Sequence, residues 1–253
     1  MMAGPWPKVF KEFHYSHNFW ISPLVAGISW FTTLSILLVR WVAIGRPRYP
    51  GQVNPDIPFV SDIAAFTFQP VFIAGCAITG VAFVGTVFAV QHVRYSPEFY
   101  GLTDDALWRQ NTSFVALFTG FLAATSLILL SVFDTFENND EHQYILMCVF
   151  AGLGAAGLLT MAVWWDQIWG PVVFVGLRKW CLVNTLLVLS QTALGLAFVI
   201  FMYTGRYRIA GFLEWTLCYI GSFWLVSFVG YTRFREGKAE EEIIDERQPL
   251  LPK

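Results

Sequence analysis

Residues Phe68 to Val90 read FQPVFIAGCAITGVAFVGTVFAV, and none of these side chains carries a charge. A helix of about 20 mainly apolar residues crosses a hydrocarbon core roughly 30 Å thick, and lipid offers the backbone no hydrogen-bond partner outside a helix or a closed barrel. Five further stretches are similarly long and apolar. The sequence therefore predicts an all-α fold, a polytopic six-transmembrane-helix bundle, over Ile21–Ile44, Phe68–Val90, Phe114–Phe133, Tyr144–Trp165, Trp180–Tyr203 and Phe212–Tyr231.

The positions of the basic residues predict how the bundle lies in the membrane. The 16 basic and 18 acidic residues leave no strongly charged surface, so nucleic acid is not an expected partner. Eleven basic residues fall on one side of the spans and four on the other, and cytoplasmic loops carry the excess of Lys and Arg. Both termini are therefore predicted to be cytosolic, with a cytosolic segment 1–20, a transmembrane domain 21–231 and a cytosolic acidic tail 232–253. The richer side holds Lys8, Lys11, Arg94, Arg109, Arg178, Lys179, Arg233, Arg235, Lys238, Arg247 and Lys253, and the poorer side holds Arg46, Arg48, Arg206 and Arg208.

The cysteines and one glycine-rich run give no sign of a cofactor or metal site. Cys76, Cys148, Cys181 and Cys218 all fall inside predicted spans, where they are expected to pack as small apolar residues. The run Gly152–Gly157 spells GxGxxG, but a dinucleotide fingerprint needs a strand before it and a helix after it. Inside a span, its small residues are expected to let a neighbouring helix approach closely. We expect neither a cofactor nor a bound metal.

Three ionisable residues share one predicted membrane depth on the lumenal or extracellular side. Asp62 lies in the first loop, His142 at the start of span four and Glu214 at the start of span six. Such a set could bind a divalent metal, act as acid and base on a lipid headgroup, or sense lumenal pH. The structural alternative has His142 holding down the first loop and Glu214 interacting with its helix dipole. Because no HxxxH, HExxH or GxSxG pattern is present, the structural alternative is favoured.

The polar residues within the spans are uncharged. Asn184 and Gln191 are seven residues apart and share a helix face, which predicts interhelical hydrogen bonds worth about 0.6 to 2 kcal/mol each. An ion-coupled or proton-coupled transporter would more often show an ionisable residue at mid-depth. Transport is therefore the least favoured class of function.

The acidic tail predicts a sorting signal. Residues 240–253 read EEEIIDERQPLLPK, in which Glu246 lies four positions before the pair Leu250 and Leu251. This spacing is typical of the acidic dileucine signal that clathrin adaptors bind in the cytosol, where the charge distribution independently places the tail. The alternative is an acidic tail in which the leucine pair occurs by chance.

The first loop carries a family resemblance. Ile57-Pro58-Phe59-Val60-Ser61-Asp62 is similar to the PYISD-type signature of the FRAG/DRAM/SFK family, which includes the damage-regulated autophagy modulators and resembles the N-terminal module of fungal CWH-type proteins. The resemblance extends over residues 17–236. Phe59 replaces the usual Tyr, and Ile63-Ala64 stands where Thr-Gly commonly follows, so the loop is expected to turn differently. Its further matches are Gln91-His92-Val93-Arg94-Tyr95, Asn111, Phe133, His142, Gln167 and Glu214-Trp215.

The resemblance implies a role in autophagy and lysosomal function, in plasma-membrane lipid organisation and phosphoinositide signalling, or in remodelling of GPI-anchor lipids, with no settled catalytic mechanism. Together with the tail, it favours a non-catalytic protein of the endolysosomal or vacuolar membrane that modulates lipid organisation or autophagy, with membrane lipids and a clathrin adaptor as partners. The plasma membrane and the Golgi are the alternative locations. The alternative function is a lipid or GPI-anchor remodelling enzyme, or its subunit, that uses Asp62, His142 and Glu214.

Overall fold

Six long helices make up most of the computed structural model, which describes residues 18–96, 106–169 and 175–233. Each of the six is long and apolar enough to cross a membrane, which confirms the predicted all-α, six-span fold. The first loop adds the one-turn helix α3, and α7 follows the fourth span. The bounds are α2 Ile21–Ala43, α3 Val60–Ala64, α4 Gln69–Tyr95, α5 Leu107–Val132, α6 Asn139–Val163, α7 Asp166–Trp169, α8 Val175–Tyr203, α9 Tyr207–Ser227 and α10 Val229–Thr232.

The helices extend past the apolar stretches that predicted them. Helix α4 continues through Gln91 to Tyr95, α5 begins at Leu107 rather than Phe114, and α9 begins at Tyr207 rather than Phe212. A helix needs apolar residues only where it faces the hydrocarbon core, so hydropathy defines the core segment and underestimates the polar turns beyond it.

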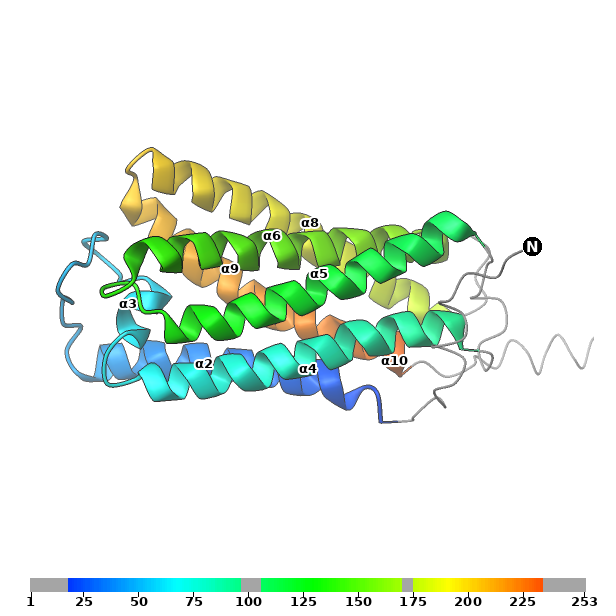
Figure 1. The fold of residues 1–253 in the computed structure, drawn as a ribbon, viewed down its shortest axis with the longest axis horizontal. Coiled ribbons are helices and arrows are strands. Elements are labelled where there is room, and N and C mark those ends of the chain that lie inside the picture. The colour runs from blue at the N-terminus through cyan, green and yellow to red at the C-terminus, as the bar shows by residue number, and fades with distance from the viewer. Residues whose placement is uncertain (1–17, 97–105, 170–174, 234–253) are drawn as a thin grey trace, which may run out of the picture.

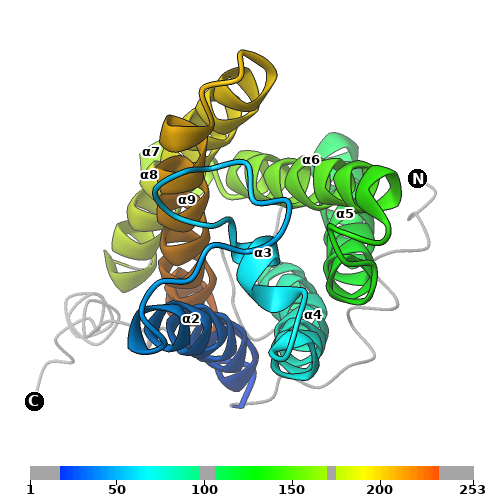
Figure 2. The ribbon, with the colours of Figure 1, turned by 90° about the vertical axis from the view of Figure 1, so that its left-hand side faces the viewer.

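The spans form a ring in the order α6, α5, α4, α2, α9, α8, in which neighbouring helices pack side by side (Figures 1 and 2). Helix α3 and the chain before it cross one end of this ring, which we call the α3 end, and α7 marks the opposite α7 end. The guanidinium of Arg233 lies over the Trp20 ring at 4.9 Å, so both ends of the helical region meet at the α7 end.

Small residues bring neighbouring helices into close contact. A Cβ atom added to Gly152 of α6 would lie 2.8 Å from the Cβ of Ala123 on α5, closer than real Cβ contacts allow. Gly75 of α4 packs in the same way against Thr33 of α2. The Gly152 contact agrees with the packing role predicted for the glycine-rich run, because small side chains let membrane helices approach.

The core is divided between the two halves of the bundle. One apolar cluster toward the α3 end includes Leu34, Phe72 and Trp215, and another toward the α7 end includes Val90 and Trp164. Many large apolar side chains lie instead on the outside of the ring, as expected where the surrounding solvent is lipid.

Candidate functional site

The family-like segment 57–62 leads into the first turn of α3, and several of its residues have specific contacts. The Asp62 carboxylate accepts a hydrogen bond of 2.9 Å from the amide nitrogen of Phe59. This is the reciprocal half of a capping box, in which an acidic residue three positions into a helix satisfies the amide that precedes it. The Phe59 ring is buried and packs edge-on against Phe198 of α8. The segment therefore forms a compact turn of helix that is fixed to the bundle.

Helix α9 holds α3 through two consecutive residues. The Glu214 carboxylate accepts the amide hydrogen of Val60 at 3.0 Å, and the indole nitrogen of Trp215 donates to the carbonyl oxygen of Pro58 at 2.9 Å. Both side chains are buried. Because the amides of a first helical turn have no partner within the helix, a carboxylate placed there stabilises the turn.

Glu214 does not lie where the sequence predicts it. Helix α9 begins at Tyr207, so Glu214 is two turns inside the helix, and the effect of a helix dipole is confined to the first turn. The predicted dipole interaction is therefore wrong. The carboxylate satisfies the amide of a different helix, α3, which reaches it only because the first loop folds back over the bundle.

Asp62 and Glu214 come together at the first turn of α3. They accept hydrogen bonds from the amides of Phe59 and Val60, which are adjacent in the chain. Burial raises the pKa of Asp62 to about 6, although the hydrogen bond from the Phe59 amide opposes the shift. The buried carboxyl therefore favours its neutral form near the pH at which an ordinary aspartate is fully charged.

His142 lies in the first turn of α6 and is also buried. Its ring Nδ1 lies 2.6 Å from the carbonyl oxygen of Phe133, at the end of α5. A carbonyl can only accept, so Nδ1 donates, and in the neutral ring Nε2 is then an acceptor. This bond closes the turn between α5 and α6 instead of holding the first loop.

The three candidate residues converge only in part. Among the described residues, no hydrogen bond joins the His142 ring to Asp62 or Glu214, and no group of three His, Cys, Asp or Glu residues could hold a metal ion. His142 and Glu214 nevertheless line one cavity, together with Val60 and Ser61 of α3. The arrangement is a polar end to an apolar cavity.

The cavity has a volume of about 460 Å³ and is lined by residues from all six spans and α3. Its walls are mainly Leu, Val, Phe and Trp side chains, and the polar groups lie at separate depths. Trp224 is ten residues beyond Glu214 on α9, which corresponds to about 15 Å along the helix axis. The cavity is therefore elongated along the bundle, with Glu214 toward its α3 end.

The cavity reaches the outer surface between α6 and α8. Met147 of α6 and Leu196 of α8 line it, and their side chains are 37% and 63% exposed. Gly154 and Gly195, on the same two helices, also line it, and a Cβ added to either would meet nothing within 4 Å. This side of the ring therefore provides a lateral opening.

Three buried polar groups along the cavity have no hydrogen-bond partner among the described residues. They are the Thr79 hydroxyl, the Gln191 amide nitrogen and the Trp224 indole nitrogen. Asn184, in contrast, donates to the Ser227 hydroxyl at 2.8 Å, which confirms one of the two predicted interhelical hydrogen bonds. The interhelical hydrogen bond predicted for Gln191 is wrong for the described residues, because its amide nitrogen has no partner there and the side chain lies at the cavity.

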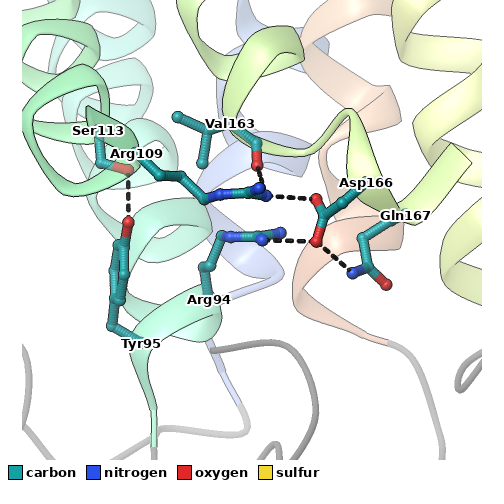
Figure 3. A network of polar contacts seen from close by, with 7 residues as sticks. All are labelled: Arg94, Tyr95, Arg109, Ser113, Val163, Asp166 and Gln167. Atoms are coloured by element: carbon teal, nitrogen blue, oxygen red, sulfur yellow. Dashed lines mark hydrogen bonds and ion pairs between the residues drawn. The ribbon is translucent and has the colours of Figure 1, made fainter. Parts of the chain in front are cut away.

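A second polar site, at the α7 end, was not predicted (Figure 3). The Asp166 carboxylate forms ion pairs with Arg94 of α4 at 2.7 Å and with Arg109 of α5 at 2.6 Å. Arg109 also donates to the carbonyl oxygen of Val163 at 2.9 Å, and Gln167 donates to Asp166 at 2.9 Å. One carboxylate thus connects α4 and α5 to the start of α7.

The two arginines of this ion-pair network are shielded from solvent. The Arg94 side chain is fully buried and its guanidinium lies 5.1 Å from the centre of the Trp164 ring, while Asp166 is one-third exposed. Burial alone would raise the pKa of Asp166, but the hydrogen bond and charge of Arg94, with the charge of Arg109, lower it. The network keeps a charged carboxylate between two cations, which is the arrangement that makes a buried ion pair tolerable.

The sequence contains a weak signal for this network. Arg94 and Arg109 lie at span ends on the side with more basic residues and were counted there as loop charges, and Asp166 follows the fourth span on the same side. Opposite charges on one side of a bundle can pair, but nothing in their spacing indicates which helices are neighbours.

The proposed sorting residues Glu246, Leu250 and Leu251 lie outside the described residues.

Comparison with known proteins matches the arrangement to one family. The model of the "Frag1/DRAM/Sfk1/Cwh43P N-terminal domain" matches residues 18–230. Protein SFK1 of Saccharomyces cerevisiae (strain ATCC 204508 / S288c) is 34% identical over 68 residues, which are 26% of this chain and 19% of that protein. The match thus spans about a fifth of that curated relative. No solved structure matches the chain.

Proposed function

The chain belongs to the Frag1/DRAM/Sfk1/Cwh43P family of membrane proteins, and on this premise we propose that it modulates lipid organisation by holding a membrane lipid, without catalysing a reaction. The observation that carries the proposal is the elongated cavity within the six spans. Ligand cavities are typically mostly apolar with a few placed polar groups, and about 460 Å³ lies within their usual size range.

The lateral opening supports exchange of the ligand with the bilayer. Met147 and Leu196 belong both to the cavity and to the outer surface, so a lipid chain can pass between α6 and α8 without crossing water. Gly154 and Gly195 leave space along this route. Because the bilayer is already as apolar as the lining, the hydrophobic effect does not favour entry of the acyl chain. Dispersion contacts with the close-packed wall favour it instead.

The hydrogen bonds of the candidate acid and base groups support a non-catalytic role. Asp62 and Glu214 each satisfy an amide of α3, and His142 satisfies a carbonyl at the end of α5. A catalytic acid or base must reach the proton that it transfers, and a productive pair is commonly oriented by a mutual hydrogen bond. Here each group is oriented by backbone instead.

Photocrosslinking tests whether lipid enters the cavity. Cells that express the protein are fed a fatty acid carrying a diazirine and an alkyne, irradiated, and the crosslinked peptides are mapped by mass spectrometry. We expect crosslinks on cavity residues of α6 and α8 that disappear in Gly195→Leu, which fills the open space, and persist in Gly176→Leu. Gly176 is a matched control because it is exposed on the same helix and also has room for a side chain. Crosslinks that are unchanged by Gly195→Leu would refute the proposal.

A lipid or GPI-anchor remodelling enzyme, or a subunit of one, is the second candidate. It is favoured by the position of Glu214, His142 and Ser61 at one end of the same cavity, with Asp62 beside them. For an enzyme, His142→Ala or Asp62→Asn should abolish lipid remodelling at unchanged protein abundance. Parallel loss of abundance and function would instead indicate a structural cluster.

We further propose that the protein acts at the endolysosomal or vacuolar membrane, in lipid homeostasis or autophagy, with the plasma membrane or Golgi as the alternatives. The supporting features are the tail residues Glu246, Leu250 and Leu251, proposed to bind a clathrin adaptor, and the excess of basic residues that predicts a cytosolic tail. In this orientation the α3 end faces the lumen.

A further inference from the structure

We infer that the cavity selects a single-chain lipid with an uncharged, hydroxyl-bearing head, such as a monoacylglycerol, over lipids with a phosphate or carboxylate head. The inference rests on the proposed function, because it specifies the lipid that the cavity holds. It is drawn from the charge, the hydrogen-bonding direction and the size of the site.

The lining has no cationic group to bind an anion. No Lys or Arg occurs among the described residues that line the cavity, and its carboxylate is Glu214. Phosphate and carboxylate heads are usually bound by Arg or Lys through charge-assisted hydrogen bonds. Asp62, next to Glu214 at the start of α3, adds no positive charge, so an anionic head placed here would be buried without a cationic partner.

The polar end of the cavity presents acceptors. One Glu214 oxygen accepts from the Val60 amide, and the carboxylate has a second oxygen. The Nδ1 of His142 donates to the Phe133 carbonyl, which leaves Nε2 as an acceptor in the neutral ring. Ser61 adds a hydroxyl that can donate or accept. A head that donates hydrogen bonds suits this end, and the hydroxyl groups of a glycerol ester do so.

Two hydrogen-bond donors deeper in the cavity favour a lipid that contains a hydrogen-bond acceptor. The Gln191 amide nitrogen and the Trp224 indole nitrogen are donors, and neither has a partner among the described residues. Trp224 is 3% exposed and is one of the residues that line the cavity. A buried donor without a partner is costly, and an acyl carbonyl can satisfy one. This requirement disfavours a plain hydrocarbon.

The size of the cavity limits the lipid to one chain. A volume of about 460 Å³ lies toward the lower part of the range for single ligands, roughly 300 to 1,000 Å³. The elongated shape between Glu214 and Trp224 accommodates one extended chain, whereas a phospholipid would add a second chain and a charged head. The site therefore favours a single-chain neutral lipid.

Native mass spectrometry of the purified full-length protein tests the selectivity. The protein is incubated with equimolar monooleoylglycerol, oleic acid and oleoyl lysophosphatidic acid, which share one chain and differ in the head. We expect the monooleoylglycerol adduct to exceed each anionic adduct by about tenfold, since an unpaired buried anion is costly. The adduct should disappear in Gly195→Leu and in Gly154→Leu and persist in Gly176→Leu.

A variant of the polar end separates head recognition from chain binding. Glu214→Gln keeps an acceptor for the Val60 amide but replaces the second carboxyl oxygen with an amide NH2 that only donates, so the preference over the two anionic lipids should narrow while total binding persists. Equal or stronger binding of the anionic lipids to the wild type would overturn the inference and leave the proposed function standing. Adducts that are insensitive to both filling substitutions would overturn the proposed function itself.

Discussion

Asp62 is a residue whose protonation affects the stability of the fold. Burial raises its pKa from 3.8 to about 6, so the folded state binds this proton more tightly than the unfolded chain does. A carboxyl of this kind contributes stability at acidic pH, and the contribution is lost as pH rises from about 4 through about 6. A shift of two pKa units corresponds to about 3 kcal/mol.

Asp62→Asn should therefore flatten the pH dependence of stability. The thermal midpoint of the wild type in detergent should fall as pH rises from 4 to 7.5, and the variant, which lacks the Asp62 carboxyl, should show a smaller slope between pH 4 and pH 6. Tryptophan fluorescence measures the thermal midpoint at a series of pH values, and Asp140→Asn, at an exposed position, is the control. Parallel curves for the wild type and Asp62→Asn would contradict the assignment. A fold that gains stability at acidic pH also suits a lumenal α3 end.

The ion-pair network at the α7 end depends on Asp166. Asp166→Ala leaves Arg94 and Arg109 without their shared carboxylate, and breaking a buried ion pair commonly costs about 3 to 5 kcal/mol. Since Asp166 is one-third exposed, we expect a loss of about 2 to 3 kcal/mol in the free energy of unfolding.

Chemical unfolding in detergent measures this loss against Glu137→Ala, which removes an exposed carboxylate. Equal stability of the two variants would show that the ion-pair network does not stabilise the bundle. Because this network lies at the α7 end, lipid binding in Asp166→Ala should persist wherever the fold persists.

At the scale of secondary structure, α3 is the element that closes the α3 end of the cavity. Trp215→Phe removes the donor to the Pro58 carbonyl, which costs about 1 kcal/mol, and the amides of residues 45–66 should then exchange about fivefold faster. Hydrogen exchange followed by mass spectrometry measures this, with Trp169→Phe as control, since Trp169 is 69% exposed. Unchanged exchange in this segment would show that Trp215 does not hold α3.

The spans could be predicted from the sequence, whereas α3 could not. A membrane helix needs one long apolar stretch, which is a local property of the chain. Helix α3 has only five residues, and it is stabilised by Glu214 and Trp215, which follow it by about 150 residues. The first loop contains four prolines, which gave no indication of a helix.

The candidate site, too, could be predicted from the sequence only in part. The choice of Asp62, His142 and Glu214 located one end of the cavity, but their partners are backbone groups that no sequence pattern identifies. Gln191 was predicted to form an interhelical hydrogen bond, but it lies at the cavity. Where its helix face points depends on how α8 packs, which the sequence does not show.

At the scale of the whole molecule, the tail and the bundle are predicted to have separate roles. Leu250→Ala combined with Leu251→Ala should move the protein to the cell surface and leave its thermal stability unchanged, because these residues lie outside the six-helix domain. Surface biotinylation and fluorescence microscopy measure the location. An unchanged steady-state location would rule out the sorting signal.

The bundle as a whole combines a close-packed ring with an opening on one side. Pairs such as α5 and α6 approach through small residues, whereas α6 and α8 diverge around the cavity. A protein that required only a stable anchor would gain by filling this space, since cavities in a core are destabilising. The retained space is consistent with a lipid as the missing part of the core.

A structure determined experimentally in a lipid bilayer disc tests this account most directly. We predict elongated density for one chain, beginning beside Glu214 and His142, passing Gln191 and reaching the opening between α6 and α8. An empty or collapsed cavity, with ordered lipid only on the outer faces of the ring, would contradict the account.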